Sequence, residues 1–137
     1  MIRYFLWLGL VFLIGSLAPF QAGMNAEMRK FLGHPLWAAA WNCFFAFLVL
    51  AVTALILRVP FPTWAGLLKA PYWAYWGGIC GALFVLVSLM FAPKFGAILL
   101  MGTLIIGTLC ASILVDHFGW FGYPVRALTP LRVGGVL

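Results

Sequence analysis

Charged residues are scarce in this sequence. Of its 137 residues, 8 are Lys or Arg and 2 are Asp or Glu, while 66% are hydrophobic. Soluble domains carry about 25% charged residues and about half apolar ones. A soluble domain of this composition would lack the polar residues needed to cover its surface, so that class is excluded. The lipid bilayer is the solvent that the composition fits.

The residues that usually carry chemistry are equally few. The three cysteines, Cys43, Cys80 and Cys110, stand in different apolar runs, which argues against a disulfide framework, and no metal-ligand spacing links them. There is no nucleophile with a base and no phosphate-binding loop. We therefore expect no enzyme, no metal and no cofactor. The net charge of +6 is spread over the loops, as at any membrane border, so nucleic-acid binding is excluded too.

Long apolar runs dominate what is present. Roughly 20 apolar residues cross a hydrocarbon core about 30 Å thick. We predict an all-α transmembrane bundle of four helices, at about residues 4–26, 36–57, 72–92 and 95–115. The prolyl link at residues 93–94 is so short that we expect an antiparallel hairpin there. Apolar residues 133–137 suggest that a fifth span starts at about residue 130.

Polar side chains inside the spans are the candidates for function. Gln21 and Asn25 are spaced i, i+4 and lie on one helix face, just after Pro19, which predicts a kink near residues 15–18. Asn42 is the amide of the second span. These amides either line a solute site or only form hydrogen bonds between helices. Trp41 and Trp76 lie inside their spans, away from the interfacial aromatic belt, and join the candidate site.

Two carboxylates are candidates for coupling or gating. Glu27 is turned about 200° from Asn25, so it either pairs with Lys30 at i+3 or exchanges a proton or cation. Asp116 ends a polar stripe with Thr108 and Ser112. The hydroxyls of that stripe either bond the carbonyl one turn back or line a water-filled path. Arg29 and Lys30 are mainly boundary residues of the first span.

Small residues suggest helix-packing faces. Residues 77–82 contain overlapping small-residue pairs, and the fourth span has a further small face. Such residues let helix backbones approach closely. We expect helix contacts at Gly77, Gly78, Gly81 and Gly107.

Three motifs in order resemble the YdcZ-type family of the drug/metabolite transporter superfamily. They are a Q-x-x-x-N-x-x-x-R pattern ending the first span, W-x-x-x-G-G-x-x-G in the third and V-D-H-F-G at the end of the fourth. The matching positions are Gln21, Asn25 and Arg29, then Trp73, Gly77, Gly78 and Gly81, then Asp116 to Gly119. The resemblance covers almost the whole chain. The resemblance implies a fifth helix that continues past Arg132 and Gly135, and this sequence departs from the family pattern there.

The resemblance implies half of an inverted-repeat transporter in the bacterial inner membrane. Such halves are expected to pair antiparallel, as a homodimer or with a sister chain, around a shared site. The basic residues give a weak orientation bias, five on one side and three on the other, which agrees with this expectation. We predict a secondary transporter, working as an exporter, for a small organic metabolite or drug-like solute. An aromatic-lined cavity with few charges suits an amphipathic or cationic solute. The alternative is a non-transporting assembly subunit of a heteromeric complex.

Overall fold

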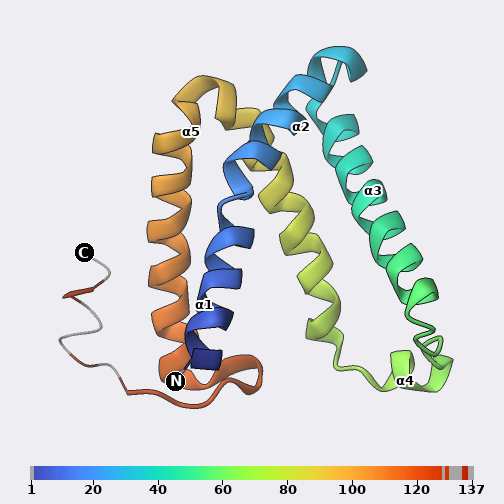
Figure 1. Ribbon diagram of the computed structural model, residues 1–137, viewed down its shortest axis with the longest axis vertical. Helices are drawn as coiled ribbons and strands as arrows, with labels where there is room; N and C mark the ends of the chain where they lie inside the picture. The colour runs from blue at the N-terminus through green and yellow to red at the C-terminus, as the bar shows by residue number, and fades with distance from the viewer. Residues whose placement is uncertain (1, 128, 130–133, 136–137) are drawn as a thin grey trace. The chain divides into compact units, whose positions relative to one another are not determined.

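The structure of the chain, a computed structural model, describes residues 2–127, 129 and 134–135 (Figure 1). The fifth span predicted from about residue 130 lies mainly outside these residues. The chain divides into two units, unit 1 at residues 1–94 and unit 2 at residues 95–137. Each unit is described by itself.

The described residues are helical and contain no strand, which confirms the all-α prediction. Unit 1 holds α1 (Ile2–Gly15), α2 (Ala18–Leu32), α3 (Pro35–Ile56), the short α4 (Trp64–Lys69) and the 3-10 turn η1 (Tyr72–Tyr75). The long α5 (Trp76–Phe118) starts in unit 1 and continues into unit 2, where the 3-10 turn η2 (Trp120–Gly122) follows. Three segments among the described residues are long and apolar enough to cross a membrane: Ile2–Leu32, Pro35–Ile56 and Tyr72–Phe118.

The third of these segments is long enough for two crossings. α5 has 43 residues, which at 1.5 Å per residue is about 65 Å, twice the hydrocarbon thickness. Its backbone leaves helical geometry at Gly96, with φ 73° and ψ 165°. Glycine adopts this conformation at little cost. The interruption therefore lies shortly after the predicted link at residues 93–94, where the backbone remains helical, and the antiparallel hairpin stays a prediction.

The first span is broken where Pro19 predicted a kink. α1 ends at Gly15 and α2 begins at Ala18, with the proline in its first turn. The Ser16 hydroxyl donates a hydrogen bond to the Leu13 carbonyl, at 2.7 Å, and so satisfies part of the exposed helix end. The kink prediction is confirmed.

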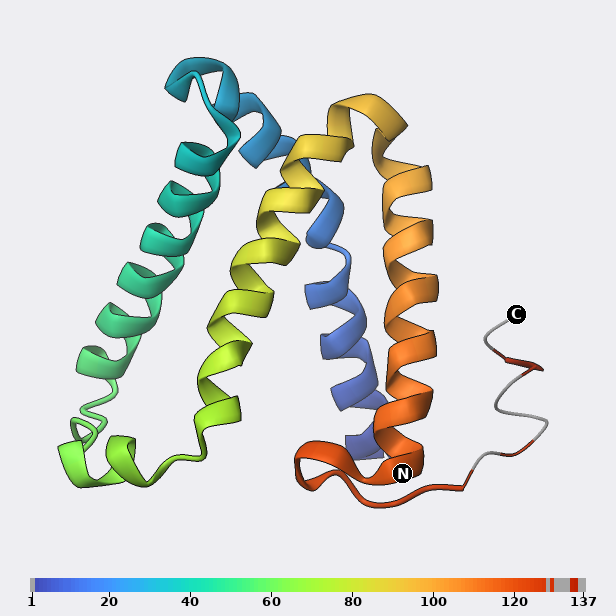
Figure 2. The same ribbon diagram turned by 180° about the vertical axis from the view of Figure 1, so that it is seen from behind.

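A two-residue turn joins α2 to α3. Gly33 has φ 75°, the left-handed conformation that suits a helix C-cap, and its N–H donates to the Arg29 carbonyl at 3.0 Å. His34 then caps α3, because its Nδ1 accepts a hydrogen bond from the Leu36 N–H at 3.2 Å. Pro35 occupies the first turn of α3, where its missing N–H costs no helical bond. Both views show α2 and α3 meeting at this turn (Figures 1 and 2).

The packed core of unit 1 consists mainly of alanines. Ala22 and Ala26 of α2 are buried, as are Ala38 and Ala39 of α3, and their small side chains allow the helices to approach closely. Leu89 of α5 is fully buried against the two α3 alanines. Small residues are therefore the buried residues of α2 and α3, and Leu89 packs α5 against α3.

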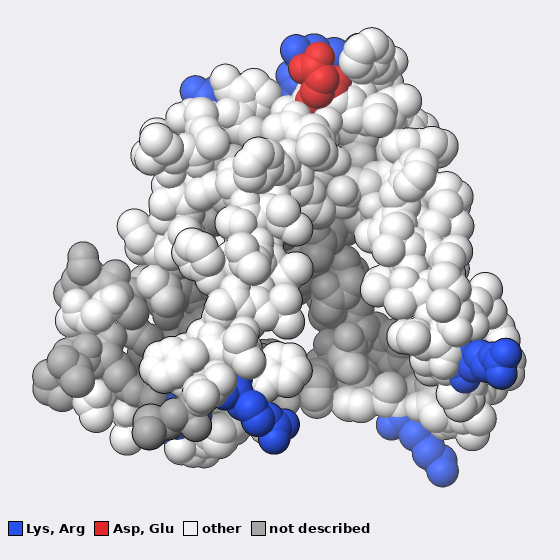
Figure 3. All heavy atoms as spheres, in the orientation of Figure 1, with Lys and Arg blue, Asp and Glu red and all other residues white. Residues whose placement is uncertain are grey.

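Most other large apolar side chains are exposed. Phe31, Phe61 and Ile98 are 80%, 83% and 92% exposed. On the face drawn in Figure 3, charged atoms occupy only a few places. Such a surface is stable against lipid tails and not against water, so the chain is a multi-pass membrane protein.

Candidate functional site

Three amides from two helices meet in unit 1. The Asn25 Nδ2 donates to Asn42 Oδ1 at 3.1 Å, and the Gln21 Nε2 donates to the same oxygen at 3.3 Å. We call Gln21, Asn25 and Asn42 the amide cluster. The structure thus brings together all three amides that the sequence singled out.

The α2–α3 turn sets the register of the cluster. Asn25 precedes Gly33 by eight residues, and Asn42 follows His34 by eight. Equal distances from the turn place the two amides at the same level of the helix pair. Gln21 lies one turn further from Gly33 on the same face of α2, within reach of the same oxygen.

The cluster lies at membrane depth. α3 has 22 residues, a length of about 33 Å that matches the hydrocarbon core. Asn42 follows Pro35 by seven residues, which places it about 10 Å along the helix. Polar groups at such depth face other protein groups or a water-filled cavity.

The cluster has unused hydrogen-bonding capacity. Asn42 Oδ1 accepts both bonds, and no other hydrogen bond to the three amide side chains occurs among the described residues. The amide oxygens of Gln21 and Asn25 and the Asn42 amide nitrogen therefore remain available. If the oxygen and nitrogen positions of all three side-chain amides are exchanged, the cluster still presents both donors and acceptors. Leaving these groups without a partner in hydrocarbon is costly.

An aromatic group stands beside the cluster on α3. The Trp41 ring lies 5.6 Å from Phe44 and 5.4 Å from Phe45, centroid to centroid. Phe45 follows Asn42 by three residues and shares its side of the helix. Phe44 and Phe45 were not among the predicted site residues, although their i+3 and i+4 spacing from Trp41 is visible in the sequence. Trp76 is 60% exposed, and no hydrogen bond or ring contact among the described residues joins it to the cluster.

The ion pair predicted for Glu27 is present. Its carboxylate lies 2.6 Å from the Lys30 ammonium, with both side chains more than half exposed. The acidic atoms visible in Figure 3 lie beside basic ones. A coupling role for Glu27 stays a prediction.

Arg29 differs from the other basic residues. It is half-buried on the same face of α2 as Ala22, Asn25 and Ala26, whereas every other described Lys or Arg is exposed. No carboxylate among the described residues forms an ion pair with it. We predicted Arg29 mainly as a boundary residue of the first span, because helical phase alone does not reveal burial.

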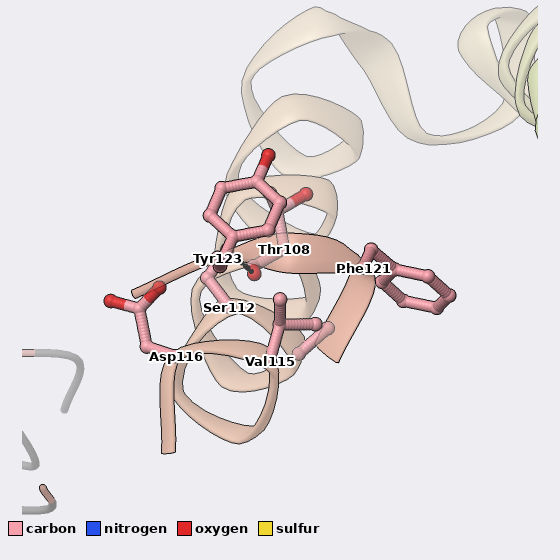
Figure 4. A pocket seen from close by; sticks show the side chains of 7 residues that line it. Thr108, Ser112, Val115, Asp116, Phe121 and Tyr123 are labelled. Atoms are coloured by element: carbon pink, nitrogen blue, oxygen red, sulfur yellow. Dashed lines mark hydrogen bonds between the residues drawn. The ribbon is translucent and has the colours of Figure 1, made fainter. Parts of the chain in front are cut away.

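Unit 2 contains a pocket of about 400 Å³ along the predicted polar stripe (Figure 4). Its lining residues are Thr108, Ala111, Ser112, Val115, Asp116, Phe121 and Tyr123. The Thr108 hydroxyl donates to Leu104 O and the Ser112 hydroxyl to Thr108 O, both at 2.7 Å. The hydroxyls therefore bond one turn back, as one of the two alternatives predicted, and their lone pairs remain free to accept.

A fold-back segment after α5 forms one wall of this pocket. Gly119 has φ 63°, and a Cβ there would lie 2.6 Å from the Val125 side chain. The Arg126 N–H then donates to the Asp116 carbonyl at 2.8 Å. Phe121, a pocket residue, also has a left-handed φ of 58°, a costly conformation for a bulky side chain. Apart from its glycines, nothing in the sequence indicated this fold-back.

The glycines expected at helix contacts are open. A Cβ at Gly77, Gly78, Gly81 or Gly107 would meet no described atom within 4 Å. Within each described unit, no close helix contact is therefore made at these glycines. The helix contacts expected there stay a prediction.

Fold and site define a polytopic, all-helical membrane protein with an amide cluster at membrane depth. The family model described as "Putative inner membrane exporter, YdcZ" matches residues 6–137. The chain therefore belongs to this inner-membrane exporter family, which is not a family of enzymes. Neither the curated proteins nor the solved structures contain a match to the chain.

Proposed function

We propose that the chain exports a small organic solute across the inner membrane, and that the amide cluster contacts the solute. The observation that carries this proposal is the convergence of two amide donors, Gln21 and Asn25, on the amide oxygen of Asn42 at membrane depth. Two amide N–H groups donate to that oxygen, and the other polar groups of the cluster are unused. The cluster can therefore bind a solute as well as hold two helices together. The family assignment supports export.

The proposal includes an inverted pair of chains. Inverted repeats with a site at their interface are a recurring architecture for alternating access. The open glycines of α5 offer a face where another helix could approach closely. In such a pair, Asp116 of one copy comes to the same membrane side as Asn25 and Glu27 of the other. We assign coupling to the two carboxylates, Asp116 and Glu27.

Solute flux in liposomes tests the proposal. The purified chain is reconstituted alone and together with a candidate sister chain, and a broad panel of labelled metabolites is screened. We expect flux of at least one solute in one of the two preparations. If neither preparation moves any solute, the transporter proposal fails and the assembly-subunit alternative replaces it.

Asn25→Ala is the informative variant. It removes one donor to Asn42 and one group available to the solute, so we expect flux to be abolished while assembly, measured by size-exclusion chromatography, is kept. Met24→Ala is the matched control, because Met24 is 69% exposed and neighbours Asn25 in α2. Unchanged flux in Asn25→Ala would remove Asn25 from the site.

A further inference from the structure

The charged group next to the amide cluster is the positively charged guanidinium of Arg29. Arg29 follows Asn25 by four residues on the packed face of α2, which puts the two side chains about 5–6 Å apart at their Cβ atoms. Gln21, Asn25 and Arg29 thus form one row of hydrogen-bonding groups, with the guanidinium at the end nearest the turn.

No carboxylate of unit 1 neutralises this guanidinium. The sequence has two acidic residues, Glu27 and Asp116. Glu27 is paired with Lys30 and is turned about 200° from Asn25, and Asp116 belongs to unit 2. A half-buried guanidinium without an acidic partner in its own unit favours an oxyanion, which its planar donors can hold by two parallel hydrogen bonds.

We infer that the exported solute is a small organic carboxylate with a hydroxyl or amide group about one helical turn from the acid. The carboxylate binds Arg29. The polar group of the solute binds the donors and acceptors that the amide cluster leaves unused. This inference rests on the proposed function and names the substrate class of the same site.

The positive charge of Arg29 disfavours the cationic solute that the aromatic residues alone suggested. A cation in the row would approach the charge of Arg29, with no described carboxylate on that face to offset it. The aromatic group at Trp41 instead offers an apolar surface for the carbon chain of the acid.

A lipid phosphate presents the same oxyanion chemistry as a carboxylate. Arg29 lies near the end of α2, at a depth that a lipid headgroup can reach. The two sources predict different effects of replacing Arg29. The loss of a lipid contact would lower the export of every solute equally, whereas the loss of a substrate contact would lower the export of acids alone.

The test compares three probes of equal length and different charge: δ-hydroxyvalerate, δ-hydroxyvaleramide and ω-hydroxypentylamine. Flux of each, together with a panel of other acids, amides and amines, is measured for the full chain in phosphatidylcholine liposomes with and without phosphatidylglycerol. Protein-free liposomes give the leak. The variants are Arg29→Gln, Arg29→Lys and, as control, Lys69→Gln, whose side chain is exposed on α4.

We expect acids to be moved in preference to amides and amines. Arg29→Gln should lower acid flux about ten- to hundredfold, the loss of one charge-assisted contact. Amide flux should change by less than about twofold, as should acid flux in Lys69→Gln. Arg29→Lys keeps the charge and should retain part of the acid flux.

Three results would overturn the inference alone: amides or amines cross but no acid does, Arg29→Gln lowers all charge classes equally, or its effect requires phosphatidylglycerol. The last result would assign Arg29 to a lipid phosphate. If no solute of any charge crosses, with or without a sister chain, the proposed function itself fails.

Discussion

The amides of unit 1 and the hydroxyls of unit 2 form their hydrogen bonds in different ways. In unit 1, amides on α2 bond an amide on α3, 17 and 21 residues away in the sequence. In unit 2, the Thr108 and Ser112 hydroxyls bond carbonyls of their own helix, four residues back. The first arrangement depends on helix packing, and the second exists in any helix.

This difference separates what each region can contribute. Bonds within one helix are satisfied before any partner or solute arrives, so the stripe of unit 2 can line a pocket without holding the fold together. The amide cluster both links two helices and keeps unused donors and acceptors. Substitutions in the two regions should therefore differ in their effects on stability and transport, and three of them can be ranked.

The largest effect is expected where α3 packs against α5. Ala38 is 1% exposed in a cluster with Ala39 of α3 and Leu89 of α5, so Ala38→Leu should destabilise the chain by about 1–3 kcal/mol through overpacking. Ala40→Leu is the matched control on the exposed side of the same helix. Unfolding in detergent micelles, followed by circular dichroism, measures both. Equal stability of the two variants would contradict the described packing of Ala38 against α5.

A smaller effect is expected from the cluster itself. Asn42→Leu removes the acceptor of two interhelical bonds, at about 0.6 kcal/mol each, and should cost about 1 kcal/mol. Thr108→Val removes a bond to the carbonyl of its own helix and should change stability by less than about 0.5 kcal/mol. The same unfolding measurement compares them. A greater loss in Thr108→Val would reverse the comparison between the units.

The smallest global effect is expected at the fold-back segment. Gly119→Ala places a Cβ against Val125 at a left-handed φ, a strain of about 1–2 kcal/mol that local opening can relieve. We expect faster hydrogen exchange at the Arg126 amide, which bonds the Asp116 carbonyl, with the exchange of α3 amides unchanged. Gly107→Ala, which meets no described atom, is the control. Unchanged exchange at Arg126 would show that the fold-back does not require Gly119.

Much of the fold followed from local sequence. Apolar length gave the spans, Pro19 the break between α1 and α2, and the i, i+3 spacing the Glu27–Lys30 pair. Helical periodicity placed Gln21 and Asn25 on one face. These features depend on residues close together in the chain, which is why composition and spacing are sufficient.

The rest depended on the turn between α2 and α3. Only the position of Gly33 and His34 sets which residues of the two helices meet, so the bonds to Asn42 could be suggested but not assigned from the sequence. The burial of Arg29 has the same origin. The interruption at Gly96, past the expected link at residues 93–94, shows that glycine rather than proline ended the helical geometry there.

Thiol labelling tests most directly whether the amide cluster faces a water-accessible path. In a chain with Cys43, Cys80 and Cys110 replaced by alanine, Asn25→Cys and Met24→Cys are treated in liposomes with a charged, membrane-impermeant thiol reagent, which reacts only where water reaches the thiolate. The two positions are at nearly the same depth, and Met24 is 69% exposed, on a surface we assign to lipid. We predict labelling at position 25 and none at position 24. Labelling at position 24 alone, or at neither position while a loop cysteine reacts, would contradict the account.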